Sequence, residues 1–213
     1  MDCSAIELTI SQRRIWTGQM LSPDKPLYNM AMAFHIKGTI EASTFSTAFQ
    51  RVIDDNDALR TIVLEHNGEP FQHIIDELRF DIELIDISAS PLPDKTADKL
   101  LKERAQTQFV LDEQLFDSAL LKLDQDRYIW FINQHHLVTD AWSVGLIVQR
   151  AGAHYAAALR KQASDLPAAP SYAAHVAEER RGAQGPQVAA AARYWSDRQR
   201  QAPRPAGFYG RPP

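Results

Sequence analysis

The sequence predicts an α+β fold in which helices cover one mixed β-sheet. Segments that alternate apolar and polar residues, as strands do, are interleaved with segments whose apolar residues recur every three or four positions, as on one face of a helix. Some neighbouring strand segments are joined by short polar turns, which indicates hairpins. The chain has 213 residues, 45% of them hydrophobic, and is therefore long enough to bury a sizeable core. Strands that alternate with helices favour helices packed on a sheet.

Several segments have the composition and alternation of strands. Asn67-Gly68 between two of them is a strong hairpin signal, because both residues tolerate the positive φ that a tight turn requires. A second hairpin is expected to turn over residues 124–127. The expected strands are 6–10, 28–37, 61–64, 71–75, 80–87, 119–123 and 128–134.

Other segments are expected to be helical. Ser11 is the expected N-cap of the first helix, and Pro23 and Pro26 follow its end. Asp140 is expected at the N-cap of the longest helix, and Gly185-Pro186 separates two alanine-rich helices near the end. The expected helices cover about 11–20, 41–55, 96–108, 141–162, 172–181 and 187–202, and the proline-rich tail 203–213 is expected to be a linker.

Composition restricts the class of protein. The net charge of −4, from 23 basic and 27 acidic residues, gives no support for binding to nucleic acid or to a membrane surface. The single cysteine, Cys3, excludes an internal disulfide and fits a reducing compartment. No stretch approaches the roughly 20 apolar residues of a membrane span, and the first residues lack the features of a signal peptide. We therefore expect a soluble cytoplasmic protein.

The clearest candidates for catalytic side chains follow the last expected strand. His135 and His136 come where an aromatic and β-branched run ends, and Asp140 follows four residues after His136. Histidine is the side chain best suited to accept and return a proton near neutral pH, and a strand end holds it rigidly. The stretch predicts proton-transfer chemistry.

Two plainer interpretations compete with that prediction. Histidines are often packed or surface residues, and adjacent residues at a strand end face opposite ways, so at most one of the pair is expected to point into a given pocket. A metal site is not expected, because His-His-x3-Asp lacks the cysteine clusters or the His-x3-His spacing of strong zinc signatures.

The nine residues 135–143, HHLVTDAWS, resemble the HHxxxDGxS motif of nonribosomal peptide synthetase condensation domains, which are grouped with chloramphenicol acetyltransferase-like acyltransferases. Other stretches agree in the family's order. LTISQRRIW at 8–16 is similar to the opening LSxAQxRLW motif, and DNDALRT at 55–61 resembles RHExLRT. FVLD at 109–112 resembles the FDL segment that precedes the strands leading to the histidines. With weaker matches at 170–175 and 194–195, the resemblance runs from residue 8 to about residue 203.

This resemblance implies a fold and a domain organisation. It implies a chloramphenicol acetyltransferase-like αβ sandwich, one lobe of a two-lobe domain, with the motif histidine in a tunnel between the lobes. Residues 1–202 would be the N-terminal lobe and residues 203–213 an interlobe linker, so the C-terminal lobe would be absent.

The resemblance also assigns roles to residues. His136 matches the second motif histidine and would act as general base or position the acceptor amine, while His135 would orient the loop. Asp140 would be structural, in an ion pair with Arg60 of the LRT motif. Ser143 completes the motif, and Trp142 is expected to pack in the core despite its place in the motif.

One departure from the family pattern concerns the loop directly. Ala141 stands where the family has glycine. If this position requires a positive φ, alanine adds about 1 kcal/mol of strain and shifts the loop. Its N–H is kept and could help hold an oxyanion.

Three functions stay open at this point. The first is amide formation between a carrier-bound acyl or peptidyl thioester and an amine acceptor. The second is transfer of an acyl group from a carrier or coenzyme A to a hydroxyl, and the third is a non-catalytic docking module. The resemblance implies no directly bound cofactor, since substrates arrive on the 4'-phosphopantetheine of donor and acceptor carrier proteins. Other expected partners are the missing C-terminal lobe and a second copy, through an exposed interlobe face.

Overall fold

The computed structural model describes residues 6–183 and 185–200. The chain divides into two compact units, residues 1–173 and residues 174–213. The first unit contains the sheets, the core and the histidine motif. The described part of the second unit consists mainly of two helices: α5 (Tyr172–Ala183), which begins two residues before the boundary, and α6 (Pro186–Arg200). The expected boundary between residues 202 and 203 lies outside the described residues.

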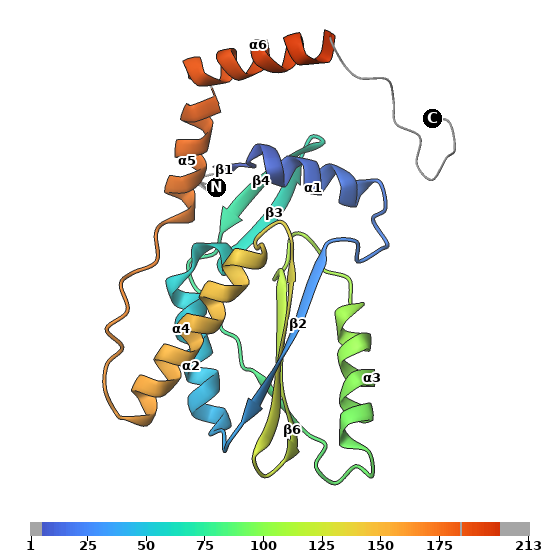
Figure 1. Ribbon diagram of the computed structural model, residues 1–213, viewed down its shortest axis with the longest axis vertical. Helices are drawn as coiled ribbons and strands as arrows, with labels where there is room; N and C mark the ends of the chain where they lie inside the picture. Colours follow the sequence, from blue (N-terminus) through green and yellow to red (C-terminus); the bar gives the residue numbers. More distant parts are fainter. Residues whose placement is uncertain (1–5, 184, 201–213) are drawn as a thin grey trace. The chain divides into compact units, whose positions relative to one another are not determined.

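The main sheet has four strands, in the order β2, β7, β6, β5. Three of them are antiparallel neighbours: β2 (Asn29–Lys37), β7 (Arg127–His135) and β6 (Phe116–Asp124). The fourth, β5 (Glu83–Asp86), runs parallel to β6. The mixed sheet predicted from the sequence is therefore confirmed (Figure 1).

A smaller antiparallel sheet, which the sequence did not predict, lies beside α1. It has the order β1 (Ile6–Glu7), β4 (Glu69–Ile74), β3 (Thr61–His66). The expected hairpin joins β3 to β4, with positive φ at Asn67 (54°) and Gly68 (80°).

Four α-helices belong to the first unit: α1 (Ile10–Met20), α2 (Ala42–Asp55), α3 (Pro93–Ala105) and α4 (Ala141–Leu159). A short 3-10 helix, η1 (Asp57–Arg60), follows α2. The expected N-cap of α1 was wrong, because Thr9 rather than Ser11 caps it. Thr9 accepts from the Gln12 N–H while the Gln12 side chain accepts from the Thr9 N–H, which is a capping box.

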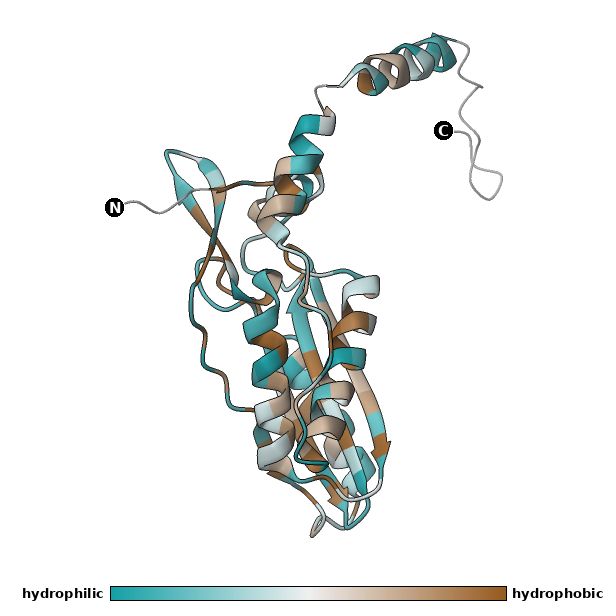
Figure 2. Ribbon diagram, turned by 90° about the vertical axis from the view of Figure 1, so that its left-hand side faces the viewer, coloured by the Kyte–Doolittle hydropathy of each residue, from teal (hydrophilic) through white to brown (hydrophobic). Residues whose placement is uncertain are grey.

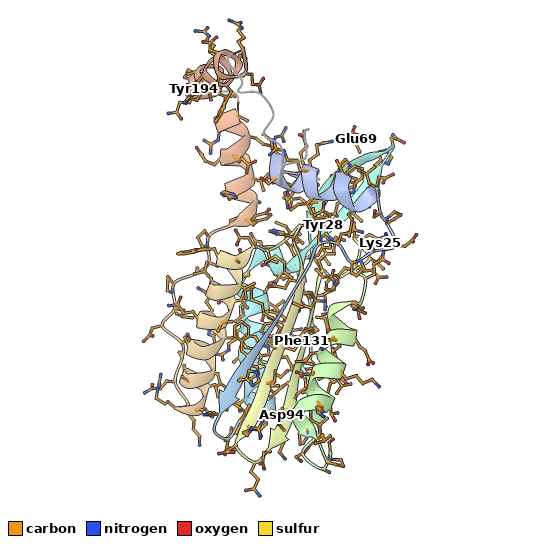
Figure 3. All side chains as sticks on the ribbon, turned by 45° about the vertical axis from the view of Figure 1, so that its right-hand side comes forward. Lys25, Tyr28, Glu69, Asp94, Phe131 and Tyr194 are labelled. Atoms are coloured by element: carbon orange, nitrogen blue, oxygen red, sulfur yellow. The ribbon has the colours of Figure 1, made fainter. Side chains whose placement is uncertain are left out.

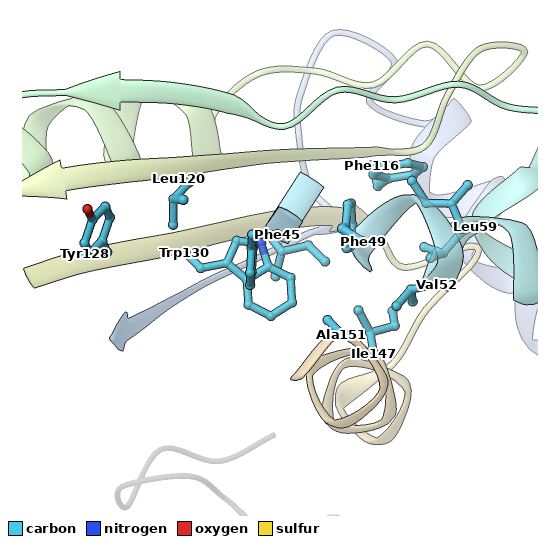
Figure 4. Close-up of a cluster of buried hydrophobic side chains, with 12 residues drawn as sticks. Phe45, Phe49, Val52, Leu59, Phe116, Leu120, Tyr128, Trp130, Ile147 and Ala151 are labelled. Carbon is cyan, nitrogen blue, oxygen red and sulfur yellow. The ribbon is translucent and has the colours of Figure 1, made fainter. Parts of the chain in front are cut away.

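The helices α2 and α4 cover one face of the main sheet. Figure 2 looks onto these two helices, which lie side by side in front of the strands. Their apolar faces meet the sheet in an aromatic cluster in which Phe49 contacts both Trp130 and Phe116 edge-on (Figure 4). Phe49 is fully buried, so this layer is the centre of the core.

Helix α3 packs on the opposite face. Its Ala97 lies against Leu121 of β6 and Ile129 of β7. Neighbouring residues of one strand therefore face different layers, as Leu120 and Leu121 do. Arg104 near the end of α3 forms a bidentate ion pair with Asp117 of β6 (2.7 and 2.8 Å), and this pairing raises the pKa of Arg104.

Within the described residues, none of the helices has the length and apolar character that a membrane span requires. The expected cellular location stays a prediction.

Candidate functional site

The histidine motif lies where β7 ends and the chain turns into α4. His135 is the last residue of β7, and its N–H donates to the Leu115 carbonyl (2.9 Å). The next N–H, that of His136, donates to the carbonyl of Tyr28 (2.9 Å), which precedes β2. Figure 3 shows Tyr28 and Lys25 on the segment between α1 and β2. The backbone of both histidines is thus fixed by the residues that directly precede the two neighbouring strands, β6 (Phe116–Asp124) and β2.

His135 is buried and neutral. Only 1% of its surface is exposed, and burial, together with the nearby His136, lowers its pKa to about 4. Its Nδ1 accepts the N–H of Leu137 (3.2 Å), so the proton of the neutral ring is on Nε2, which faces Oε1 of Gln19 at 3.4 Å. His135 is therefore bonded to the backbone of the loop through Leu137 and stays neutral near neutral pH.

His136 is only half-buried, and its tautomer is the opposite one. Its Nδ1 lies 2.6 Å from the carbonyl oxygen of Thr139. A carbonyl can only accept, so Nδ1 must carry the hydrogen, and the lone pair of the neutral ring is on Nε2. Of the two motif histidines, His136 is therefore the one that has its lone pair on Nε2.

The turn that carries His136 is held in place by buried apolar side chains and by a hydrogen bond from Gln12. Leu137 and Val138 are buried in a third apolar cluster with Leu8, Val63 and Leu115. In addition, the Leu137 carbonyl accepts a hydrogen bond from Nε2 of Gln12 (2.9 Å).

Gln12 and Gln19 are site residues that the sequence reasoning missed. The available signal was Thr9-x-x-Gln12, a capping box inside the opening motif.

Asp140 is the N-cap of α4, as expected. Its Oδ1 accepts from the N–H of Ser143 (2.7 Å) and from the Ser143 hydroxyl (2.6 Å). The Ser143 hydroxyl and N–H lower the pKa of Asp140, so the carboxylate is ionised at neutral pH. Asp140 and Ser143 therefore fix the start of the helix that follows His136.

The expected ion pair between Asp140 and Arg60 was wrong. Arg60 pairs with Asp57 three residues before it (3.0 Å), and Asp57 also accepts from the N–H of Tyr172 (3.1 Å). The Arg60 guanidinium also donates to the carbonyls of Ile53, Ile75 and Asp76. The physical reason is that η1 places Arg60 beside the Asp57 carboxylate of the same short helix, while the Asp140 carboxylate caps α4.

The positions of Ala141 and Trp142 follow from that cap. Ala141 is the first residue of α4, and among the described non-glycine residues only Asn67 and Lys161 have positive φ. The glycine position of the motif is therefore ordinary helix here, and alanine adds no strain. Trp142 is 79% exposed, so the expectation that it packs in the core was wrong, because the first turn of α4 turns this side chain outward.

Within residues 6–183 and 185–200, no three histidine, cysteine, aspartate or glutamate side chains gather as metal ligands would.

Comparison with known proteins identifies the family. The condensation domain model matches residues 4–206. A dimodular nonribosomal peptide synthase of Bacillus subtilis is 30% identical over 207 residues, which is 97% of this chain and 9% of that protein. The phosphinothricin tripeptide synthetase PhsC of Streptomyces viridochromogenes is 30% identical over 206 residues, 95% of this chain and 19% of that synthetase.

Solved structures agree. The starter condensation domain of rhizomide synthetase RzmA, in a complex with C8-CoA, superimposes with a TM-score of 0.90 at 27% identity, over 97% of this chain and 48% of that one. The first condensation domain of the calcium-dependent antibiotic synthetase, at 23% identity and a TM-score of 0.86, has the same fold. The chain thus spans about half of each solved domain (48% and 50%) and a small part of the synthetases. The chain belongs to the condensation domain family.

Proposed function

We propose that the chain is the N-terminal lobe of a condensation domain that joins a carrier-bound acyl or peptidyl thioester to an amine, with His136 at the reaction centre. The observation that carries the proposal is the tautomer of His136. Its Nδ1–H is held by the Thr139 carbonyl at 2.6 Å, so Nε2 has the lone pair that a general base needs.

In this mechanism the amine nitrogen attacks the thioester carbonyl carbon. A C–N bond forms, the C–S bond breaks, and the amine nitrogen loses one proton. Nε2 of His136 accepts that proton or orients the amine that carries it, and the departing sulfur takes up one proton as the thiol. His135, neutral and buried, supports the loop, and Asp140 supports the start of α4.

Donor and acceptor carrier proteins, each with a phosphopantetheine arm, are the proposed partners. The complex of the related RzmA domain with C8-CoA supports an acyl thioester as the donor class. The second lobe of a condensation domain is a further proposed partner, since the chain spans 48% of that solved domain. Self-association through an exposed interlobe face stays a prediction.

The test is amide formation by a two-lobe condensation domain that contains this chain, with carrier-bound donor and acceptor. His136→Ala is expected to lower the rate of amide formation by about 100-fold or more, because a general base contributes a rate factor of that order. His66→Ala is the matched control, because His66 is exposed on the β3–β4 hairpin.

Three outcomes would contradict the proposal. Amide formed equally fast by His136→Ala would remove His136 from the chemistry. Ester product from a hydroxyl acceptor, without amide, would favour an O-acyltransferase. No product from the wild type with several donors and acceptors would favour a docking module.

A further inference from the structure

Helix α1 carries two buried glutamines that face the histidine loop. Gln12 and Gln19 are seven residues apart, about two helical turns, so their side chains lie on the same face. Each is only 4% exposed, although most of α1 is open to solvent. A buried amide is costly unless its polar atoms are hydrogen-bonded, so the partners of these two side chains show what they hold in place.

Gln12 links three parts of the site. Its Nε2 donates to the Leu137 carbonyl (2.9 Å) and lies 3.0 Å from Oε1 of Gln72 on β4. Its Oε1 accepts the N–H of Thr9 (2.9 Å), which closes the cap of α1. The residue directly after His136 is therefore tied to the start of α1.

Gln19 acts on the other side of the loop. Its Oε1 is the acceptor that faces Nε2 of His135 (3.4 Å). Its Nε2 donates to the carbonyls of Ser22 (3.1 Å) and Lys25 (2.9 Å), which shape the segment leading to Tyr28. The Tyr28 carbonyl in turn accepts the N–H of His136 (2.9 Å).

We propose that Gln12 and Gln19 are positioning residues for the reaction at His136, a role that rests on the function proposed above. Gln12 fixes the carbonyl that follows His136. Gln19 accepts the Nε2–H of His135 and fixes the segment that holds the amide of His136. Neither side chain touches substrate in this role. Together they determine where Nε2 of His136 stands.

The kinetic test replaces each glutamine by methionine, which has a similar shape and no amide, in the two-lobe domain. Displacing a reacting group by about 1 Å costs up to about 100-fold in rate, so we expect kcat for amide formation to fall about 10- to 100-fold with KM little changed. The matched control is Gln50→Met. Gln50 on α2 makes three hydrogen bonds, to Asp54, Leu78 and Phe80, and in the described part of the chain it has no bond to the histidine loop.

A second readout does not depend on turnover. Nitrogen-15 NMR of the imidazoles distinguishes the two tautomers, and the wild type is expected to show hydrogen on Nε2 of His135 and on Nδ1 of His136. The Leu137 N–H still donates to Nδ1 of His135 in Gln19→Met, so this variant is expected to keep the tautomer and to lose the hydrogen bond from Nε2–H, which shifts the Nε2 and Nε2–H resonances. Gln19→Glu keeps the acceptor and is expected to restore that hydrogen bond. If Gln12→Met fails to fold, Gln12→Glu replaces it, because it keeps the acceptor for Thr9 and loses the donor to Leu137.

The outcomes separate this proposal from the proposed function. Unchanged kcat in both folded glutamine variants, or an equal loss in Gln50→Met, would overturn the positioning role. If the wild type forms no amide, the proposed function fails, and the NMR spectra still decide. Nε2 and Nε2–H resonances of His135 that are unchanged in Gln19→Met would then overturn the proposal, and their shift in that variant would support it.

Discussion

The partners of Arg60 give the most discriminating test of the structure. A buried ion pair between Arg60 and Asp140 would make either single substitution cost about 3–5 kcal/mol, because the other charge would be left alone. In the structure Asp140 is an exposed helix cap, and loss of such a cap costs about 1 kcal/mol. The Arg60 side chain is 13% exposed and its charged partner, Asp57, is 23% exposed. Arg60→Ala is expected to cost about 2–3 kcal/mol through lost charged hydrogen bonds.

A double-mutant cycle measures the difference. Asp140→Ala, Arg60→Ala and the double variant are unfolded with urea, and the free energies of unfolding are compared with the wild type. Arg60 and Asp140 share no hydrogen-bond partner in the described structure, so their effects should add to within about 0.5 kcal/mol. The control cycle between Arg60 and Asp57 should show a coupling of about 1 kcal/mol or more. A coupling above about 1.5 kcal/mol between Arg60 and Asp140 would refute the assignment.

Three further predictions concern the loop and its surroundings. The pKa of His135 is about 4 when folded and about 6.5 when unfolded, so the unfolded chain binds more protons between these values; stability should fall by about 3 kcal/mol as the pH drops from about 6.5 to about 4. His135→Asn should reduce that slope in urea titrations at several pH values, and a slope equal to that of the wild type would contradict a buried neutral ring. Ala141→Gly should not raise the unfolding midpoint, because the position is helical, and a stabilised variant would indicate strain at Ala141. Gly18→Ala should cost about 1–3 kcal/mol in urea unfolding, since a Cβ there would lie 2.0 Å from the Tyr28 hydroxyl; Tyr28→Phe should relieve part of that cost, and equal costs in both backgrounds would contradict the contact.

Local signals were enough for the elements that depend on local chemistry. Asn67-Gly68 gave the β3–β4 hairpin because positive φ is a property of those two residues. Asp140 was placed as the N-cap of α4 because a carboxylate directly before a helix accepts hydrogen bonds from the free N–H groups of its first turn. The alternation over residues 80–87 was interpreted as a longer strand than β5 (Glu83–Asp86). Phe80 and Ile82 instead donate their N–H groups to Gln50 and Ser46 of α2.

The parts of the site that depend on distant residues were not predictable in the same way. The link from Gln12 to Leu137 spans 125 positions, and no local pattern reports it. Asp140 was assigned as the partner of Arg60 by resemblance, whereas Arg60 forms its ion pair with Asp57, which is nearer in the sequence. Trp142 was expected to pack in the core despite its place in the motif, whereas the rotation of α4 set by Asp140 turns it outward.

The pairing of β2 with β7 has a consequence for how the protein is made. Each residue of β2, from Asn29 to Lys37, pairs with one near the end of the sheet's sequence, from His135 to Arg127. At a synthesis rate of ~5–20 residues per second, β2 waits roughly 5–20 s before its partner strand exists. The carbonyl of Tyr28, which holds His136, cannot be in place before that pairing closes. Because such distant contacts form slowly, the histidine loop should be among the last parts of the molecule to acquire its native geometry during folding.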